Sequence, residues 1–391
     1  MATALSTRTV LSGPRPVPVP DKRFYQPELD SLRFIAFLCV FVYHCMPGLP
    51  GFYNGWPHAI VWVIGAAVTA GQFGVPVFFV LSAYLITNLL LRERERSGKL
   101  DIRGFYIRRI LRIWPLYYVF LATACLLPFI AHYQRMPPVY IAGYVLLAGN
   151  WVQAFAAYSA PTLLARPLWT VAIEEQFYLV WPLVVRKASR ASIAMIAIAL
   201  IVTANLSRVL LAFSDLSRRF LIINYNTVSN VDAIALGVLL ALALRRSPAL
   251  APLRRVALFL ACLSVMIVVG GLMYVHLKTG AIVGESLAAF ASAGILVSFL
   301  GVRSRAIRNS VLQYLGKISY GLYLIHVSMW ICVRHFLNES AARYQTLGGR
   351  LEIAVLALVI TVLMASASYR WLESPFLRLK QRFTHVRSRP V

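Results

Sequence analysis

Two ionisable side chains in the first apolar segment could together support acid–base chemistry. Arg33 follows the polar run 28–31, and His44 lies eleven residues further on, just before Pro47. Eleven residues make about three turns of helix, so both side chains lie on nearly the same face, roughly 16 Å apart along the axis. An imidazole titrates near neutral pH and suits a general base. The structural alternative is an Arg that extends toward the membrane surface and an interfacial His.

Two adjacent carboxylates, Glu174 and Glu175, enter a second apolar segment. Adjacent residues of a helix point about 100° apart, so at most one of the two should face a common site. Glu174, Tyr178 and Trp181 share one helix face. An ionised group inside an apolar segment is costly and is therefore a functional candidate. An acidic pair near a helix N-terminus can instead serve the helix dipole.

A basic cluster with the spacing of one helix face lies at residues 108–112. Arg109 and Arg112 are three residues apart, so a helix would present them together. Guanidinium groups bind phosphates through paired hydrogen bonds. The spacing is therefore compatible with an anion site. An arginine anchor at the membrane surface, beside Trp114 and Tyr117, explains the same pattern.

Two weaker candidates lie in later apolar segments. Asp232 is an isolated acid at the start of one segment, and His326 lies well inside another. Both are candidates because ionisable groups within a membrane span are rare. For His326, a core histidine satisfied by its neighbours is an equally good interpretation. The five cysteines form no CxxC or Cys/His spacing, so we expect neither a disulfide framework nor a metal site.

The composition places these residues in a membrane protein. Of the 391 residues, 59% are hydrophobic and 14% are charged. A soluble globular domain has about 45–50% apolar and about 25% charged residues. Soluble, disordered and fibrous classes are therefore excluded. The net charge is +25, but Lys and Arg fall in short clusters between apolar runs, so we expect no nucleic-acid partner.

The apolar segments predict an all-α fold, a polytopic integral membrane bundle of about ten transmembrane helices, since a spanning helix needs about 20 residues. We expect a multi-pass protein of the cell (inner or plasma) membrane. The expected spans are 31–47, 72–91, 111–131, 168–185, 192–213, 229–244, 254–276, 282–301, 311–334 and 351–373. Segment 59–70 is predicted to be an interfacial helix, and segment 139–155 to be interfacial or re-entrant.

Lys and Arg residues are concentrated in alternate connections between these spans. The basic connections are 92–109, 186–190, 245–255 and 303–308, together with the end of the chain. Basic loops favour the cytoplasmic side, so we predict that both termini are cytoplasmic. The expected parts are a disordered Pro-rich tail at 1–27, a transmembrane domain at 28–377 and a basic cytoplasmic tail at 378–391.

The residues alone leave two classes of function open. One is an enzyme that takes an anionic donor from the cytoplasm and uses a histidine as base. The other is a non-enzymatic transporter or exporter whose buried ionisable groups move protons or substrate. No internal repeat is evident, which disfavours an inverted-repeat transporter.

The motifs, in their order and spacing, resemble those of the membrane acyltransferase-3 family. Its members are multi-pass acyltransferases that modify sugars, envelope polymers and some macrolides. The resemblance covers residues 25–377 and rests on segments 29–33 with His44, 78–86 with Ser82, 108–115, 169–182, 316–326 and 371–375. Ala83 stands where the family usually has Gly, and Asn230 stands where it often has Arg.

The resemblance implies an O-acyltransferase that uses acyl-coenzyme A, expected to be acetyl-coenzyme A, and no metal. The acceptor would be a hydroxyl of a carbohydrate, a cell-envelope polymer or a glycosylated small molecule. His44 would act as general base or as a covalent acyl relay. Glu174 would orient its imidazole, as the acid of a catalytic triad does.

The remaining candidates are expected to bind the two substrates. The arginines would hold the phosphates of the donor at the cytoplasmic face, because their forks suit phosphate oxygens. They are Arg33, Arg109 and Arg112. The candidates for substrate binding are Ser82, Tyr178, Asp232 and His326.

Overall fold

The computed structural model describes most of the membrane domain. The described residues are 25–46, 53, 55–130, 135–155, 163–216, 219–244, 250–275, 280–337 and 346–383. Over these residues the chain is helical and contains no β-strand, which confirms the expected all-α class. The predicted N-terminal tail lies almost entirely outside the described residues, as do residues 384–391.

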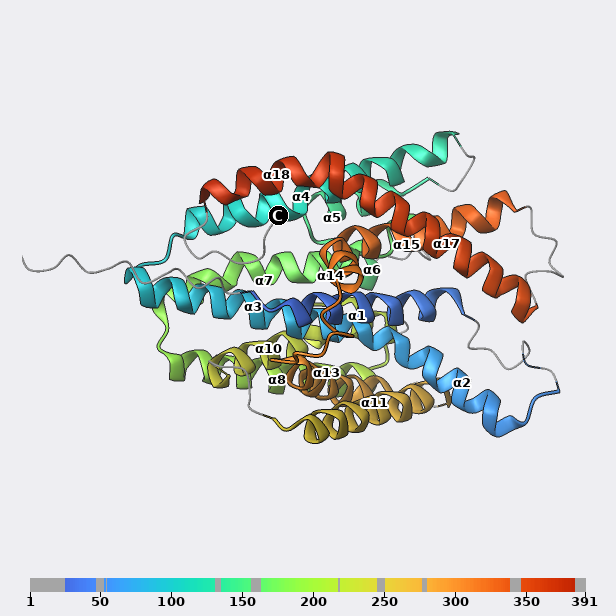
Figure 1. Cartoon of the computed structure of the whole chain (residues 1–391), viewed down its shortest axis with the longest axis horizontal. Helices are drawn as coiled ribbons and strands as arrows, with labels where there is room; N and C mark the ends of the chain where they lie inside the picture. The colour runs from blue at the N-terminus through green and yellow to red at the C-terminus, as the bar shows by residue number, and fades with distance from the viewer. Residues whose placement is uncertain are drawn as a thin grey trace, which may run out of the picture.

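The helices run mostly lengthwise through an elongated bundle, with α1, α3 and α7 between the outer helices (Figure 1). In chain order they are α1 (Pro27–Cys45), α2 (His58–Ala70), α3 (Gly74–Ser97), α4 (Ile102–Ile130), α5 (Pro138–Val145), α6 (Gly149–Phe155), α7 (Leu168–Lys187), α8 (Arg190–Ala212), α9 (Arg219–Tyr225), α10 (Val231–Ala243), α11 (Pro252–Val275), α13 (Glu285–Phe299), α14 (Ser310–Lys317), α15 (Ser319–Phe336), α17 (Leu347–Ser368) and α18 (Ser374–Lys380).

Each of the ten expected spans falls on one or more helices, but the count of ten is not confirmed. Six helical stretches of the described chain are long and apolar enough to cross a membrane, or seven if α9 and α10 form one bent span. Helices α1, α7 and α15 are not among them. These helices carry Arg33, Glu174 and His326, and such residues make a helix less apolar.

Two of the expected boundaries differ in the structure. The predicted interfacial helix 59–70 continues as α2 through the turn Gly71–Phe73 into α3, giving one helical stretch, His58–Ser97. The predicted span 311–334 is divided at Ile318 into α14 and α15. Segment 139–155, which is predicted to be interfacial or re-entrant, forms the two short helices α5 and α6.

Glycines let α1, α3 and α10 approach closely around the site. A Cβ atom at Gly74 would lie 2.3 Å from the carbonyl oxygen of Ala36 on α1. A Cβ atom at Gly237 on α10 would lie 2.3 Å from the carbonyl oxygen of Val80 and 2.9 Å from the Cβ of Ala83 on α3. The bare backbone of Gly237 thus accommodates Ala83, which replaces the glycine usual in the family. Small residues at such crossings allow tight packing of membrane helices.

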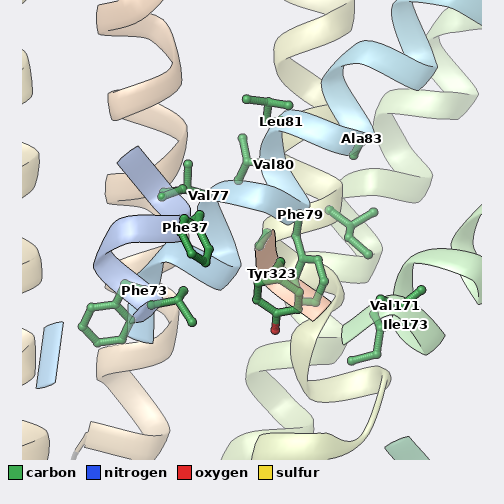
Figure 2. Packing of buried hydrophobic residues seen from close by; sticks show 14 of the residues in the cluster. Phe37, Phe73, Val77, Phe79, Val80, Leu81, Ala83, Val171, Ile173 and Tyr323 are labelled. Carbon is green, nitrogen blue, oxygen red and sulfur yellow. The ribbon is translucent and has the colours of Figure 1, made fainter. Parts of the chain in front are cut away.

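The packed core fills the space between these helices. It includes Phe37 of α1, Phe79 of α3, Val171 of α7 and Tyr323 of α15, all less than a tenth exposed (Figure 2). This core fixes the helix faces that carry the candidate residues, because a side chain cannot turn without displacing close-packed neighbours.

Several basic connections gather at one end of the bundle. The α3–α4 and α7–α8 connections lie together at the left of Figure 1. There Arg94 donates hydrogen bonds to the carbonyl oxygens of Val185, at 2.6 Å, and Ala188, at 2.8 Å. Arg190 forms an ion pair with Glu95. The grouping agrees with the charge pattern of the sequence, and the cytoplasmic location of both termini stays a prediction.

The end of the described chain is helical. Helix α18 and the turn Gln381–Phe383 continue into the segment expected to be a basic tail from residue 378. The physical reason is docking: α18 packs against α4, and its Leu377 side chain is buried.

Candidate active site

Six of the nine expected site residues line one cavity of about 180 Å³. The cavity lies between α1, α3, α4, α7, α15 and α18, and we call it the arginine cavity. The six are Arg33, Ser82, Arg109, Arg112, Glu174 and Tyr178. Helices far apart in the sequence therefore bring the basic cluster, the serine motif and the acidic motif to one place.

The arginine cavity carries an excess of positive charge. Four basic side chains line it, Lys380 among them, against the two carboxylates of Asp30 and Glu174. Arg33 pairs with Asp30 at 2.6 Å. Within the described part of the chain, Arg109 and Arg112 form neither an ion pair nor a hydrogen bond through their side chains. Two arginines without a carboxylate partner favour a bound anion.

An aromatic ring and hydrogen-bonded hydroxyl groups line the centre of this cavity. The Arg109 guanidinium lies 5.6 Å from the centre of the Tyr178 ring. The Tyr178 hydroxyl is hydrogen-bonded to Ser82 and donates to Glu174 at 3.4 Å. Glu175 points elsewhere and accepts a hydrogen bond from the Trp114 indole at 3.1 Å. The two adjacent acids thus face different surroundings, as helical geometry predicts.

His44 lies in a second cavity, of about 140 Å³, which we call the histidine cavity. Its polar lining comes from Tyr43, His44, Gln72, Arg166, Trp169, Asn224, Tyr225, Asn230 and Glu285. Tyr43, Arg166 and Asn224 are exposed and mark its mouth. Val75 and Tyr323 line both cavities, so these two side chains form a wall between them.

The imidazole of His326 lies against that of His44, with ring centres 5.3 Å apart. His326 is fully buried, and its Nδ1 lies 2.6 Å from the carbonyl oxygen of Tyr323. A carbonyl only accepts, so in the neutral ring Nδ1 carries the proton and Nε2 carries the lone pair. Among the described residues, that buried Nε2 has no hydrogen-bond partner. A fixed acceptor therefore lies beside His44.

Glu174 and His44 are not brought into one cluster. Glu174 lines the arginine cavity and His44 the histidine cavity. No hydrogen bond joins them in the described part of the chain. The role expected for Glu174, to orient the His44 imidazole, stays a prediction, and the ionisable rings that lie against His44 are those of Tyr43 and His326.

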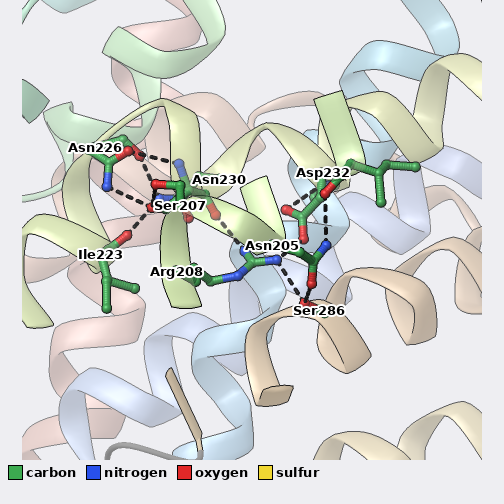
Figure 3. Close-up of polar contacts among 11 residues, drawn as sticks. Asn205, Ser207, Arg208, Ile223, Asn226, Asn230, Asp232 and Ser286 are labelled. Carbon is green, nitrogen blue, oxygen red and sulfur yellow. Dashed lines mark hydrogen bonds and ion pairs between the residues drawn. The ribbon is translucent and has the colours of Figure 1, made fainter. Parts of the chain in front are cut away.

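Asp232 lines neither cavity. It forms a buried ion pair with Arg208, which also donates to the Ser229 carbonyl oxygen and, at 2.8 Å, to Ser286 (Figure 3). The group links α8, α10 and α13. The Asp232 carboxylate is already engaged by Arg208. Its expected role in substrate binding stays a prediction.

Sequence reasoning missed three charged residues of this region. Arg166 and Glu285 line the histidine cavity, and Arg208 is buried within α8. A signal was present for Arg208, since it is a charge inside an expected span. Arg166 and Glu285 lie at segment ends, where charged residues are common and therefore uninformative.

Comparison with known proteins identifies the architecture that holds both cavities. Residues 26–370 match the family described as an acyltransferase domain. The chain belongs to this acyltransferase-3 family. The family match covers both cavities except for Tyr25, just before its start, and Lys380, ten residues beyond its end. With its apolar helices, this acyltransferase-3 member is a multi-pass membrane protein.

Curated relatives of the chain are named as O-acetyltransferases or putative O-acetyltransferases. The chain is similar to the O-acetyltransferase OatA of Staphylococcus aureus, 27% identical over 90% of this chain and 57% of the relative. It is also similar to the peptidoglycan O-acetyltransferase OatA of Listeria monocytogenes, 34% identical over 41% of this chain and 24% of the relative. Further Staphylococcus aureus relatives are matched over 58% of their length, so the chain spans less than two thirds of them.

No solved structure matches the chain. Within the described residues, no group of three or more His, Cys, Asp or Glu side chains could hold a metal ion.

Proposed function

We propose that this acyltransferase-3 member is a membrane O-acyltransferase that moves an acyl group, expected to be acetyl, from acyl-coenzyme A to a hydroxyl group. The acceptor is a carbohydrate, a cell-envelope polymer or a glycosylated small molecule. The observation that carries the proposal is the meeting of two unlike cavities at the wall formed by Val75 and Tyr323. One cavity suits an anionic donor, and the other presents a histidine.

The arginine cavity supports the donor assignment. Coenzyme A carries its charge on phosphates and its acyl group at the end of a long uncharged arm. Arg109 and Arg112, with Arg33, supply the guanidinium groups that would hold the phosphates. Ser82 and Tyr323 line the same cavity toward the wall, where the uncharged arm would extend.

His44 is the proposed base. Its imidazole takes the proton of the acceptor hydroxyl as the oxygen attacks the acyl carbonyl, and a C–O bond replaces the C–S bond. The proton then passes from His44 to the departing thiolate, so protons and bonds balance. As a covalent relay, His44 would instead carry the acyl group between the two substrates. In either route, the acceptor nitrogen of His326 can hold the His44 ring.

Glu174 belongs to the donor side of the wall in this proposal. With Ser82 and Tyr178 it forms a hydrogen-bonded group facing the arginine cavity. Its carboxylate can act on the imidazole only if donor binding changes the distance between them. Activity of Glu174 variants therefore tests the expected triad role.

The histidine cavity supports a carbohydrate acceptor. One basic residue, Arg166, and one acidic residue, Glu285, line it, so their charges balance. Among the described residues, the Trp169 indole N–H, the Asn224 side-chain amide and the Glu285 carboxylate have no hydrogen-bond partner. Trp169 and Tyr225 pack edge to face with ring centres 5.3 Å apart. Aromatic surface beside uncommitted donors and acceptors suits a polyhydroxylated ring.

The test is coenzyme A release by the protein in nanodiscs, with acetyl-coenzyme A and a panel of sugar acceptors. Wild type is compared with His44→Ala and with His58→Ala, an exposed histidine outside both cavities. Acceptor-dependent release that is lost only in His44→Ala supports the proposal. Equal release from all three proteins removes His44 from the mechanism. No release with any of several acyl donors favours a transporter or exporter.

A further inference from the structure

The C-terminal helix contributes a cation to the arginine cavity from outside the family match. Lys380 lines this cavity, although the match ends at residue 370. Leu377, three residues earlier on α18, is buried where the helix packs against α4. Residues three apart share a helix face, so the docking of Leu377 directs Lys380 inward. Arg378 points about 100° away from Leu377 and is exposed.

A hydrogen bond from an ion-paired arginine holds the end of this segment to the cavity helices. Arg108 of α4 donates to the Phe383 carbonyl oxygen at 2.5 Å. The same guanidinium pairs with Glu93 of α3 at 3.0 Å. The C-terminal segment is thereby fixed to the two helices that carry Ser82, Arg109 and Arg112. A segment secured in this way can present Lys380 at a defined position.

We propose that residues 374–383 complete the donor site and that Lys380 binds a phosphate group of the donor. The inference rests on the proposed function, because it adds a phosphate-recognition residue to the same site. An ammonium group is a strong phosphate ligand as a point charge. Lys380 raises the lining cations from three to four against two carboxylates, which strengthens the preference for a polyanion.

Two donors separate phosphate recognition from chemistry. Acetyl-coenzyme A carries phosphates, whereas S-acetyl-N-acetylcysteamine carries the same thioester without them. In Lys380→Gln we expect coenzyme A binding to weaken by about tenfold, since a charge-assisted hydrogen bond is lost. Turnover of the phosphate-free donor should be unchanged. Lys380→Arg should restore most of the binding, and Arg378→Gln, on the same helix, is the matched control.

Binding is measured by calorimetry on the full chain in nanodiscs, with coenzyme A and with inorganic pyrophosphate. The inference is overturned if Lys380→Gln binds both probes as Arg378→Gln does. If wild type binds pyrophosphate but not coenzyme A, and Lys380→Gln loses pyrophosphate, the anion site stands while the proposed donor fails. If wild type binds neither probe, the phosphate site is rejected as well.

Discussion

His44 and His326 are 282 positions apart in the sequence, yet their rings are neighbours. The Tyr323 carbonyl fixes the orientation of the His326 ring, and the lone pair on Nε2 is left to receive a proton donor. A base whose ring is already held in its reactive orientation needs no further binding energy to align it with the substrate. We therefore predict that His326 is a positioning residue, which acts on the substrates through His44.

We predict that His326→Gln lowers kcat by at least about tenfold, because orienting a catalytic base is part of the gain from general base catalysis. The KM for acetyl-coenzyme A should change little, since His326 does not line the arginine cavity. Steady-state kinetics in nanodiscs checks this. A variant with normal kcat would show that the His326 ring only fills space.

Arg112 should behave in the opposite way. We predict that Arg112→Gln weakens coenzyme A binding by about 10- to 100-fold, as expected for the loss of hydrogen bonds to a charged group. Raising the salt concentration should weaken wild-type binding more than that of the variant. Arg305→Gln, on the α13–α14 connection and outside the cavity, is the control. Equal coenzyme A affinity for Arg112→Gln and Arg305→Gln would contradict the donor assignment.

For single residues, the sequence predicted which arginines gather in one cavity better than it predicted which side chain each residue contacts. Arg33, Arg109 and Arg112 were recognisable because arginine spacing on a helix face is visible in the chain. The His44–His326 contact was not, since nothing in either helix reports which face of the other it meets. The ion pair of Asp232 with Arg208 escaped for the same reason.

Among the helices, a close backbone approach holds the part of α3 that carries Ser82 against α10. Gly237 of α10 accepts the backbone of Val80, two residues before Ser82 on α3. Any side chain there would push α10 away from α3. The position of the serine motif therefore depends on a glycine that lies outside the cavity.

We predict that Gly237→Val lowers stability by about 1–3 kcal/mol, the usual effect of overpacking. Gly348→Ala is the control, because a Cβ atom there would meet nothing within 4 Å. Thermal unfolding in detergent measures both. An unchanged melting temperature in Gly237→Val would mean that α3 and α10 can move apart freely.

The Arg208–Asp232 pair gives a second prediction for the helices. Asp232→Ala leaves a buried guanidinium without its carboxylate, so we expect a loss of about 3–5 kcal/mol. Replacing both residues with apolar ones should recover much of that stability. Thermal unfolding is compared with acyl transfer in the same preparations. A variant that is inactive but normally stable would instead support the substrate-binding role expected for Asp232.

Helix positions were predictable from apolar runs, and their interruptions were not. The break at Ile318 follows Gly316 and Lys317 inside the expected span 311–334, and it coincides with the approach of Gly316 to the Asp30 backbone on α1. The α2–α3 continuity likewise depends on how Gly71 meets Cys39. Both are outcomes of contacts between helices, which periodicity within one segment does not record.

For the whole molecule, the two-sided distribution of charge makes a prediction about membrane orientation. In a cysteine-free background, Lys99→Cys on the α3–α4 connection should react with an impermeant thiol reagent only after the cytoplasmic face is opened. Trp56→Cys, before α2, should react in intact cells. This follows from the preference of basic connections for the cytoplasm. The reverse labelling pattern would mean that each cavity faces the side of the membrane opposite to the one assigned to it.

The wall shared by the two cavities has a consequence for the energy supply of the cell. If the arginine cavity opens to the cytoplasm and the histidine cavity opens to the other face, Val75 and Tyr323 separate the water on the two sides of the membrane. A gap wide enough for a long acyl chain would also admit ions and dissipate the membrane potential. If the proposed transfer takes place across this wall, the opening must stay narrow, and a small acyl group such as acetyl needs the narrowest one.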